Sequence, residues 1–184
     1  MDRIIIRSDD WDFRLDTQQY IDAHEEFKKR GLIETMAIQP TTWGKLSNYH
    51  QDLIDYVNKE LDAGTYDLQV HGWQHAHYDE MEMDFVVRDL MATKYFCIKY
   101  FGRDPKIFFT PWNCMSNNLE RAAQFVGMEV SNESNDIWRF IREAKVDKFS
   151  GKTLYVHLWK ADEMALFIEM LDLVVKIEKE RGNL

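Results

Sequence analysis

The feature that most constrains the fold of this 184-residue chain is the alternation of short apolar runs with longer segments of helical periodicity. The short runs are typical of buried strands, and apolar residues spaced three and four apart indicate helices that cover them. Because parallel strands need a crossover connection, this alternation predicts a parallel sheet in an α/β fold. Periodicity alone does not decide whether the sheet is open and doubly wound or rolled into a barrel.

Six to seven strands and at least five helices are expected, within a single domain of residues 1–184. The expected strands lie at residues 3–8, 33–39, 66–71, 106–110, 128–132 and 153–159. The expected helices are those that carry Tyr20 to Phe27, Leu53 to Leu61, Met83 to Phe101, residues 117–126 and Met164 to Val174. Residues 133–150 show no clear pattern.

Charge and composition narrow the classes of partner. The formal net charge is −9, from 32 acidic and 23 basic residues, and the basic residues are scattered. This distribution excludes an electrostatic nucleic-acid interface. The first ten residues contain only a short apolar run, too short for a signal peptide or a membrane span, so we expect a cytoplasmic protein without a membrane partner. The sequence carries no indication of oligomeric state.

Polar residues follow four of the expected strands. They are the pair Asp9 and Asp10, the pair His71 and His75, the stretch "TPWNC" at 110–114, and His157. In a parallel α/β sheet the loops after the strands converge on one face, where ligands bind. We therefore expect these residues to share one site.

The spacing of His71 and His75 suits a metal ion. A helical turn would bring two histidines four residues apart to one side, and a carboxylate from a neighbouring strand would make a third ligand. An isolated pair of this kind is more often structural, but two adjacent carboxylates repel unless a cation or a proton separates them. Two imidazoles and one carboxylate suit zinc best, and cobalt, nickel or iron would fit similarly.

Four stretches, in order, carry a family resemblance over residues 4–159. They are "SDDWD" (8–12), "HGWQH" (71–75), "FFTPWN" (108–113) and "YVHLW" (155–159). This ordered set resembles the principal motifs of the NodB-like polysaccharide deacetylases, carbohydrate esterase family 4. The resemblance implies a distorted (β/α) barrel of six to seven parallel strands.

The resemblance also implies roles for individual residues. Asp9 corresponds to the catalytic base, Asp10 with His71 and His75 to the metal ligands, and His157 to the general acid. The implied activity is metal-dependent removal of an acetyl group from an N-acetylated sugar or a related amide, with water as the nucleophile. Because no secretion signal is visible, a soluble N-acetylated sugar or small amide fits better than wall polysaccharide.

Aromatic and amide side chains are candidates for substrate contacts, because indole rings stack on sugar rings. The candidates are Trp43, Trp73, Trp112 and Asn113, with Trp112 the foremost. His77 is expected at the rim of the site or in solvent. His24 and His50 are expected at the surface.

Two departures from the family pattern bear on mechanism. The family usually has Ser or Thr after the first metal histidine and Arg two residues before the third-motif proline, where this chain has Gly72 and Phe109. Asn113 is one residue that could hold Asp9 in place of that arginine. The stretch "NDIW" (135–138) is weakly similar to the fourth motif and offers Asp136 as the acid that supports His157. The main alternative is a catalytically inactive domain of this type that binds a carbohydrate or a protein.

Overall fold

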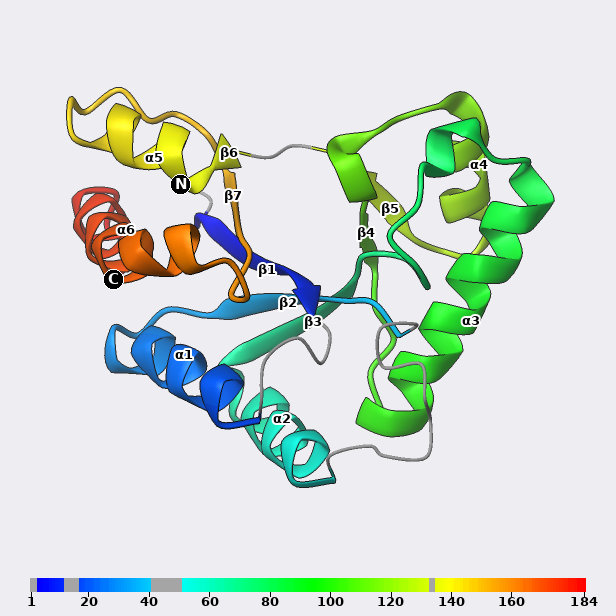
Figure 1. The fold of residues 1–184 in the computed structure, drawn as a ribbon, viewed down its shortest axis with the longest axis horizontal. Helices are drawn as coiled ribbons and strands as arrows, with labels where there is room; N and C mark the ends of the chain where they lie inside the picture. The colour runs from blue at the N-terminus through cyan, green and yellow to red at the C-terminus, as the bar shows by residue number, and fades with distance from the viewer. Residues whose placement is uncertain (1–2, 12–16, 41–50, 133–134) are drawn as a thin grey trace.

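One parallel sheet organises the computed structural model, which describes residues 3–11, 17–40, 51–132 and 135–184. Its strand order is β5-β4-β3-β2-β1-β7-β6, and every pairing is parallel. The strands are β1 (Ile5–Trp11), β2 (Glu34–Ile38), β3 (Tyr66–Val70), β4 (Ile107–Phe109), β5 (Glu129–Ser131), β6 (Asn135–Asp136) and β7 (Thr153–Val156). The sheet curls into a partial barrel with β5 and β6 as its edges (Figure 1).

Helices surround the outside of this curled sheet (Figure 1). They are α1 (Thr17–Lys29), α2 (Gln51–Ala63), α3 (Met83–Phe101), α4 (Asn117–Phe125), α5 (Ile137–Ala144) and α6 (Ala161–Glu180). Two 3-10 turns, η2 (Tyr78–Glu80) and η3 (Pro111–Asn113), lie in the loops after β3 and β4. The predicted distorted (β/α) barrel is confirmed. Among the described residues, no helix combines the length and apolar character that a membrane crossing requires.

The seventh strand and one helix lie where the sequence showed no clear pattern. β6 has only two residues, and it is held at the sheet edge by the Asn135 side chain, which donates a hydrogen bond to the Thr153 carbonyl at 3.0 Å. α5 follows directly and buries Ile137, Phe140 and Ile141. These residues recur at helical spacing, a signal for α5 that the sequence analysis missed. The preceding strand β6 is too short to be predicted.

The expectation that His24 lies at the surface is wrong. Its ring is fully buried between α1 and the sheet, where it stacks on Tyr66 with 3.6 Å between ring centroids. Nδ1 lies 2.9 Å from a Glu34 carboxylate oxygen, and Nε2 lies 3.1 Å from the Thr65 hydroxyl. The other Glu34 oxygen accepts a hydrogen bond from Ser8 on β1. A buried polar network therefore joins α1, β1 and β2.

Candidate metal centre and catalytic site

A bulge at the end of β1 turns two adjacent carboxylates toward the same cavity. Between Ser8 and Trp11, three steps along β1 correspond to two steps along β2, so β1 carries one extra residue. Asp10 lies in this bulge with a φ of 56°, a left-handed conformation that Asp tolerates better than most residues. Successive strand residues normally point to opposite faces. The bulge removes this alternation, and both Asp9 and Asp10 line the cavity.

His71 follows β3 and presents a defined nitrogen to Asp10. Its Nδ1 donates a hydrogen bond to the Phe109 carbonyl at 2.8 Å, because a carbonyl can only accept. Nε2 therefore carries the lone pair, and it lies 3.6 Å from Asp10 Oδ1. Burial is the main reason that the pKa of His71 falls to about 3, so the ring stays neutral. A neutral imidazole fixed through its other nitrogen is the usual form of a metal-binding histidine.

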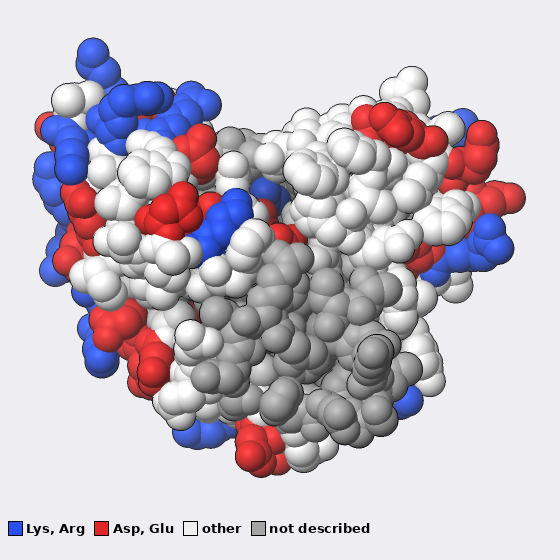
Figure 2. Space-filling model, viewed as in Figure 1, with Lys and Arg blue, Asp and Glu red and all other residues white. Residues whose placement is uncertain are grey.

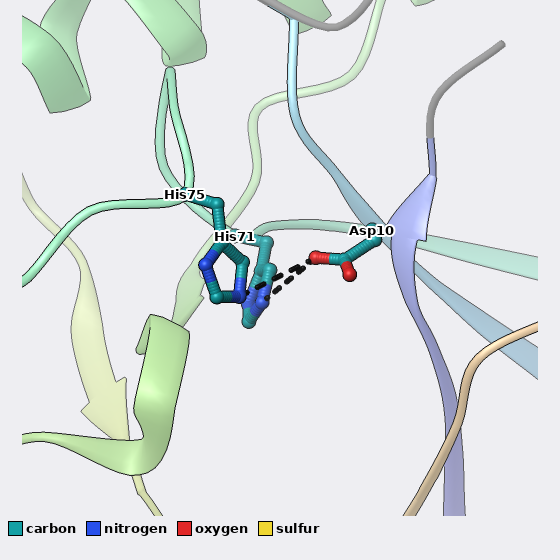
Figure 3. A group of neighbouring side chains, drawn as sticks. All are labelled: Asp10, His71 and His75. Carbon is teal, nitrogen blue, oxygen red and sulfur yellow. Dashed lines mark ion pairs between the residues drawn. The ribbon is translucent and has the colours of Figure 1, made fainter. Parts of the chain in front are cut away.

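The predicted helical turn between His71 and His75 is wrong, because residues 71–77 form a loop with bends. The loop still brings the two rings together, with 5.4 Å between their centroids. His75 Nε2 lies 3.6 Å from Asp10 Oδ1, the same oxygen that faces His71. Figure 3 shows both imidazoles directed toward the Asp10 carboxylate.

Gly72 is required by the packing of this loop. It adopts a φ of 88°, and a Cβ at this position would lie 2.3 Å from the Tyr78 hydroxyl oxygen. Tyr78 is buried, and its hydroxyl group contacts the Asp89 carboxylate of α3 at 2.6 Å. Asp89 also accepts a hydrogen bond from the Trp73 backbone N–H at 2.8 Å. The tyrosine that anchors the loop thus excludes the Ser or Thr that the family usually has after the first histidine.

The three predicted ligands come together from two strand ends. One ligand atom each from Asp10, His71 and His75 lie within 4.8 Å of one another. Two neutral imidazoles and one buried carboxylate are a donor set that suits zinc or a similar divalent cation, and a tetrahedral ion would keep a further position for a ligand. The residues present therefore fit a metal ion.

Asp9 lies beside this cluster and contacts the buried guanidinium of Arg7. Arg7 Nη2 lies 3.1 Å from Asp9 Oδ2, and both side chains are buried. Burial raises the pKa of Asp9 above its ordinary value, although the Arg7 guanidinium opposes this shift. Asn113 does not replace the missing arginine directly. Its Oδ1 accepts a hydrogen bond from Arg7 Nη2 at 3.0 Å, so it holds the cation that contacts Asp9.

His157 follows β7 and is held by a carboxylate of the next helix. Its Nδ1 lies 2.9 Å from Glu163 Oε1, and its backbone N–H donates to Glu163 Oε2 at 2.6 Å. Burial alone would raise the pKa of Glu163, but the hydrogen bonds from His157 outweigh it and lower the pKa. The carboxylate that contacts His157 is therefore that of Glu163, whereas the Asp136 carboxylate accepts a hydrogen bond from the Arg139 backbone N–H at the start of α5.

A cavity of about 410 Å³ connects these groups. Figure 2 shows the face hollowed near its centre, with acidic and basic side chains visible inside. Besides the groups already described, the lining includes Thr110, Trp112, Tyr155, Trp159 and Lys160.

The predicted substrate-contact residues are distributed unevenly around this cavity. Trp112 has a φ of 58°, is 61% exposed and lines the cavity, so its indole lies at the rim. There it stacks on His77, with 5.2 Å between centroids and 3° between the planes, so the rim position expected for His77 is confirmed. Asn113 also lines the cavity, whereas Trp73 does not and packs edge-on against Phe96. Trp43 and His50 lie outside the described residues.

The sequence analysis did not identify two residues that contact the predicted site residues, Arg7 and Glu163. Arg7 precedes Asp9 by two positions, so strand periodicity places both on one face and could have revealed the pair. Glu163 lies six residues after His157 in the next element, and no periodicity links the two positions.

The family model described as polysaccharide deacetylase matches residues 18–131. No curated protein matches the chain.

Several solved structures share the fold. A family 4 carbohydrate esterase from Streptomyces lividans, in complex with acetate, has a TM-score of 0.73 at 14% identity, over 98% of this chain and 90% of that one. The peptidoglycan deacetylase PdaC from Bacillus subtilis has a TM-score of 0.72 at 16% identity, over 96% and 84%. A family 4 pseudoenzyme from Bacillus anthracis has a TM-score of 0.71 at 14% identity, over 98% and 62%.

We predict that Gly72→Ala distorts the loop that carries His75. The Cβ must displace Tyr78, so the variant should lose about 1–3 kcal/mol of unfolding free energy through overpacking, in addition to the backbone cost of a positive φ. Urea denaturation of both proteins measures this loss.

Gly64→Ala is the matched control, because Gly64 has a φ of 74° and no atom lies within 4 Å of its added Cβ. It reports the backbone cost alone. Equal destabilisation by the two substitutions would show that Tyr78 does not restrict residue 72.

Proposed function

Because the chain belongs to the polysaccharide deacetylase family, we propose that it is a metal-dependent hydrolase that removes an acetyl group from an N-acetylated sugar or a related amide. The observation that carries this proposal is the convergence of one ligand atom each from Asp10, His71 and His75 within 4.8 Å, with Asp9 and His157 in the same cavity. The proposed metal is a single divalent cation, with zinc first and cobalt, nickel or iron as alternatives.

Asp10, His71 and His75 would hold the metal ion. Such an ion supplies Lewis acidity, which polarises an acyl carbonyl and makes a nearby water more acidic. His71 contributes as a neutral ligand because burial lowers its pKa and Phe109 holds its other nitrogen. The two proton transfers of the reaction are assigned to side chains that do not bind the metal.

Asp9 is the proposed general base. It accepts a proton from the attacking water as the water oxygen forms a bond to the acyl carbon. It is buried, contacts Arg7 and lines the same cavity as the three proposed ligands. A pKa that burial raises makes the carboxylate a stronger base than an exposed aspartate.

His157 is the proposed general acid. Nδ1 faces the Glu163 carboxylate and the Lys160 ammonium, whereas Nε2 lies 3.9 Å from Asp10 Oδ2 on the cavity side, so the proton on Nε2 is the one proposed for transfer. This proton passes to the amine nitrogen as the C–N bond breaks, which yields a free amine and acetate. The carboxylate of Glu163 stabilises the positive imidazolium that must exist before the transfer.

Trp112 is the proposed contact for the substrate ring. Its indole lies at the cavity rim, stacked on His77, where one face can meet a sugar. Peptidoglycan and xylan appear in the names of similar structures. We propose an N-acetylated carbohydrate or a small amide as the substrate, because the family model describes deacetylases and names no individual substrate.

The inactive alternative has one specific support, because a pseudoenzyme of the same fold is among the similar structures. The binding domain and the hydrolase differ in turnover, because only the hydrolase releases acetate. A binding domain would retain its ligand after loss of the base, whereas a hydrolase would lose turnover.

We predict that the two adjacent aspartates separate metal binding from catalysis. Asp10→Ala should abolish zinc retention, because it removes one of three ligands. Asp9→Asn should retain zinc and lower the rate of acetate release from N-acetyl sugars by ~10²–10⁴-fold, the usual contribution of a general base. Zinc content by mass spectrometry and an acetate assay on the same preparations check both outcomes.

Wild-type protein is the reference in both assays. Retention of zinc by wild type without acetate release from any N-acetylated sugar or small amide tested would favour the binding domain over the hydrolase.

We predict that Glu163 and not Asp136 supports the general acid. Glu163→Gln should lower kcat by ~10²-fold, because the amide cannot stabilise the imidazolium as a carboxylate does. Asp136→Asn is the control on the neighbouring position, since its carboxylate caps α5. A larger loss in Asp136→Asn than in Glu163→Gln would reverse the assignment.

A further inference from the structure

We propose that Arg7 is the positioning residue for Asp9, and that its buried guanidinium fixes the direction of the carboxylate that acts as general base. This inference rests on the proposed function for the role of Asp9. The placement of Arg7 itself comes from contacts on three elements of the sheet, β1, β4 and β7.

The geometry of β1 brings the two side chains together. Arg7 and Asp9 are two residues apart in one strand, so they project from the same face. Arg7 Nη2 lies 3.1 Å from Asp9 Oδ2, and the side chains are 1% and 5% exposed. Solvent therefore does not screen this pair, and the cation acts on the carboxylate at close range.

Stability alone is a poor reason for such a pair. Removing two charges from water carries a desolvation cost that can exceed their attraction, and packed apolar side chains of similar volume are often as stable or more so. A fully buried arginine in a cavity that holds the proposed base therefore indicates a requirement of the site rather than of the core.

The guanidinium contacts two aromatic rings and an amide. Its Cζ lies 4.8 Å from the Phe109 ring centroid and 5.4 Å from the Tyr155 ring centroid, and Tyr155 is the direct neighbour of Arg7 across β1 and β7. Asn113 accepts a hydrogen bond from Nη2 at 3.0 Å. A planar guanidinium held by aromatic rings and an amide has little freedom, so it can impose a direction on its partner.

Phe109 also connects this arrangement to the metal ligands. Its ring contacts the Arg7 guanidinium, while its backbone carbonyl accepts the hydrogen bond from His71 Nδ1. The same residue thus sets the position of a proposed ligand and of the group that contacts Asp9. Phe109, at the end of β4, thereby helps to set the position of the proposed base relative to the ligand cluster.

The polar contacts of the Arg7 side chain are made through a single nitrogen. Among the described residues, Nε and Nη1 have no hydrogen-bond partner, so Nη2 makes the polar contacts that the structure assigns to this side chain. The effect of substituting Arg7 should therefore fall mainly on Asp9 and Asn113.

The test compares the kinetics of zinc-loaded Arg7→Lys and Arg7→Met with wild type. Loss of orientation should lower kcat by ~10²-fold in Arg7→Met, with KM changed by less than about threefold, because a misdirected base affects the chemical step. Arg7→Lys retains the charge but not the planar group, so it should recover only part of the rate. Zinc content should match wild type in both.

A relocated guanidinium provides the rescue. Because the Phe109 ring lies against Arg7, an arginine at position 109 can reach the space beside Asp9. The double variant Arg7→Met/Phe109→Arg should recover at least tenfold in kcat over Arg7→Met. Removal of Arg7 leaves a buried unpaired carboxylate and can prevent folding, so Arg7→Met/Asp9→Asn, which lacks both charges, serves as the folding control.

A crystal structure of Arg7→Met supplies a readout that does not depend on turnover. The Asp9 carboxylate should turn away from the direction that it has in wild type. An unchanged Asp9 carboxylate, or a kcat within threefold of wild type, would overturn the positioning role. Failure of the hydrolase proposal differs from both results, because wild-type protein would then release no acetate while Asp9 still turned in the variant.

Discussion

Two buried carboxylates at the end of β1 are the constraint on which the rest of the site depends. Asp9 and Asp10 are adjacent and nearly inaccessible to solvent, and like charges in such a place repel each other strongly. The chain meets this constraint differently for each residue. Arg7 offsets Asp9, whereas Asp10 faces two imidazoles whose arrangement suits a cation. The division of charge corresponds to the proposed division of labour between base and ligand.

The fold serves this arrangement through its strand ends. β1, β3, β4 and β7 each deliver one group of site residues to the same cavity, and the bulge in β1 allows two successive residues to contribute. The end of β4 contacts both parts of the site, because the Phe109 carbonyl accepts a hydrogen bond from His71 and the Phe109 ring contacts Arg7. At this site, the changes from the family pattern at Gly72 and Phe109 are explained by Tyr78 and Arg7, which occupy the space beside them.

Much of this could be predicted from the sequence. Long periodic segments predicted five helices, short apolar runs predicted six to seven strands, and the ordered motifs predicted that Asp10, His71 and His75 share one site. β6 has only two residues, too few to show the alternation of a strand. The bulge at Asp10 is defined by the register between β1 and β2, which the sequence does not show. The contact of Glu163 with His157 joins two different elements, so residue types alone do not report it, whereas the two-residue spacing of Arg7 and Asp9 in β1 was a usable signal. His24 was misread because a histidine on an apolar helix face can be satisfied by buried partners from other elements.

Anomalous diffraction from crystals of the zinc-loaded protein tests the central claim most directly. A divalent cation held by Asp10, His71 and His75 predicts one strong peak at about 2.0–2.2 Å from both Nε2 atoms and one Asp10 oxygen. Absence of a peak there, or a peak confined to exposed groups such as the neighbouring His77 and Asp79, would contradict it.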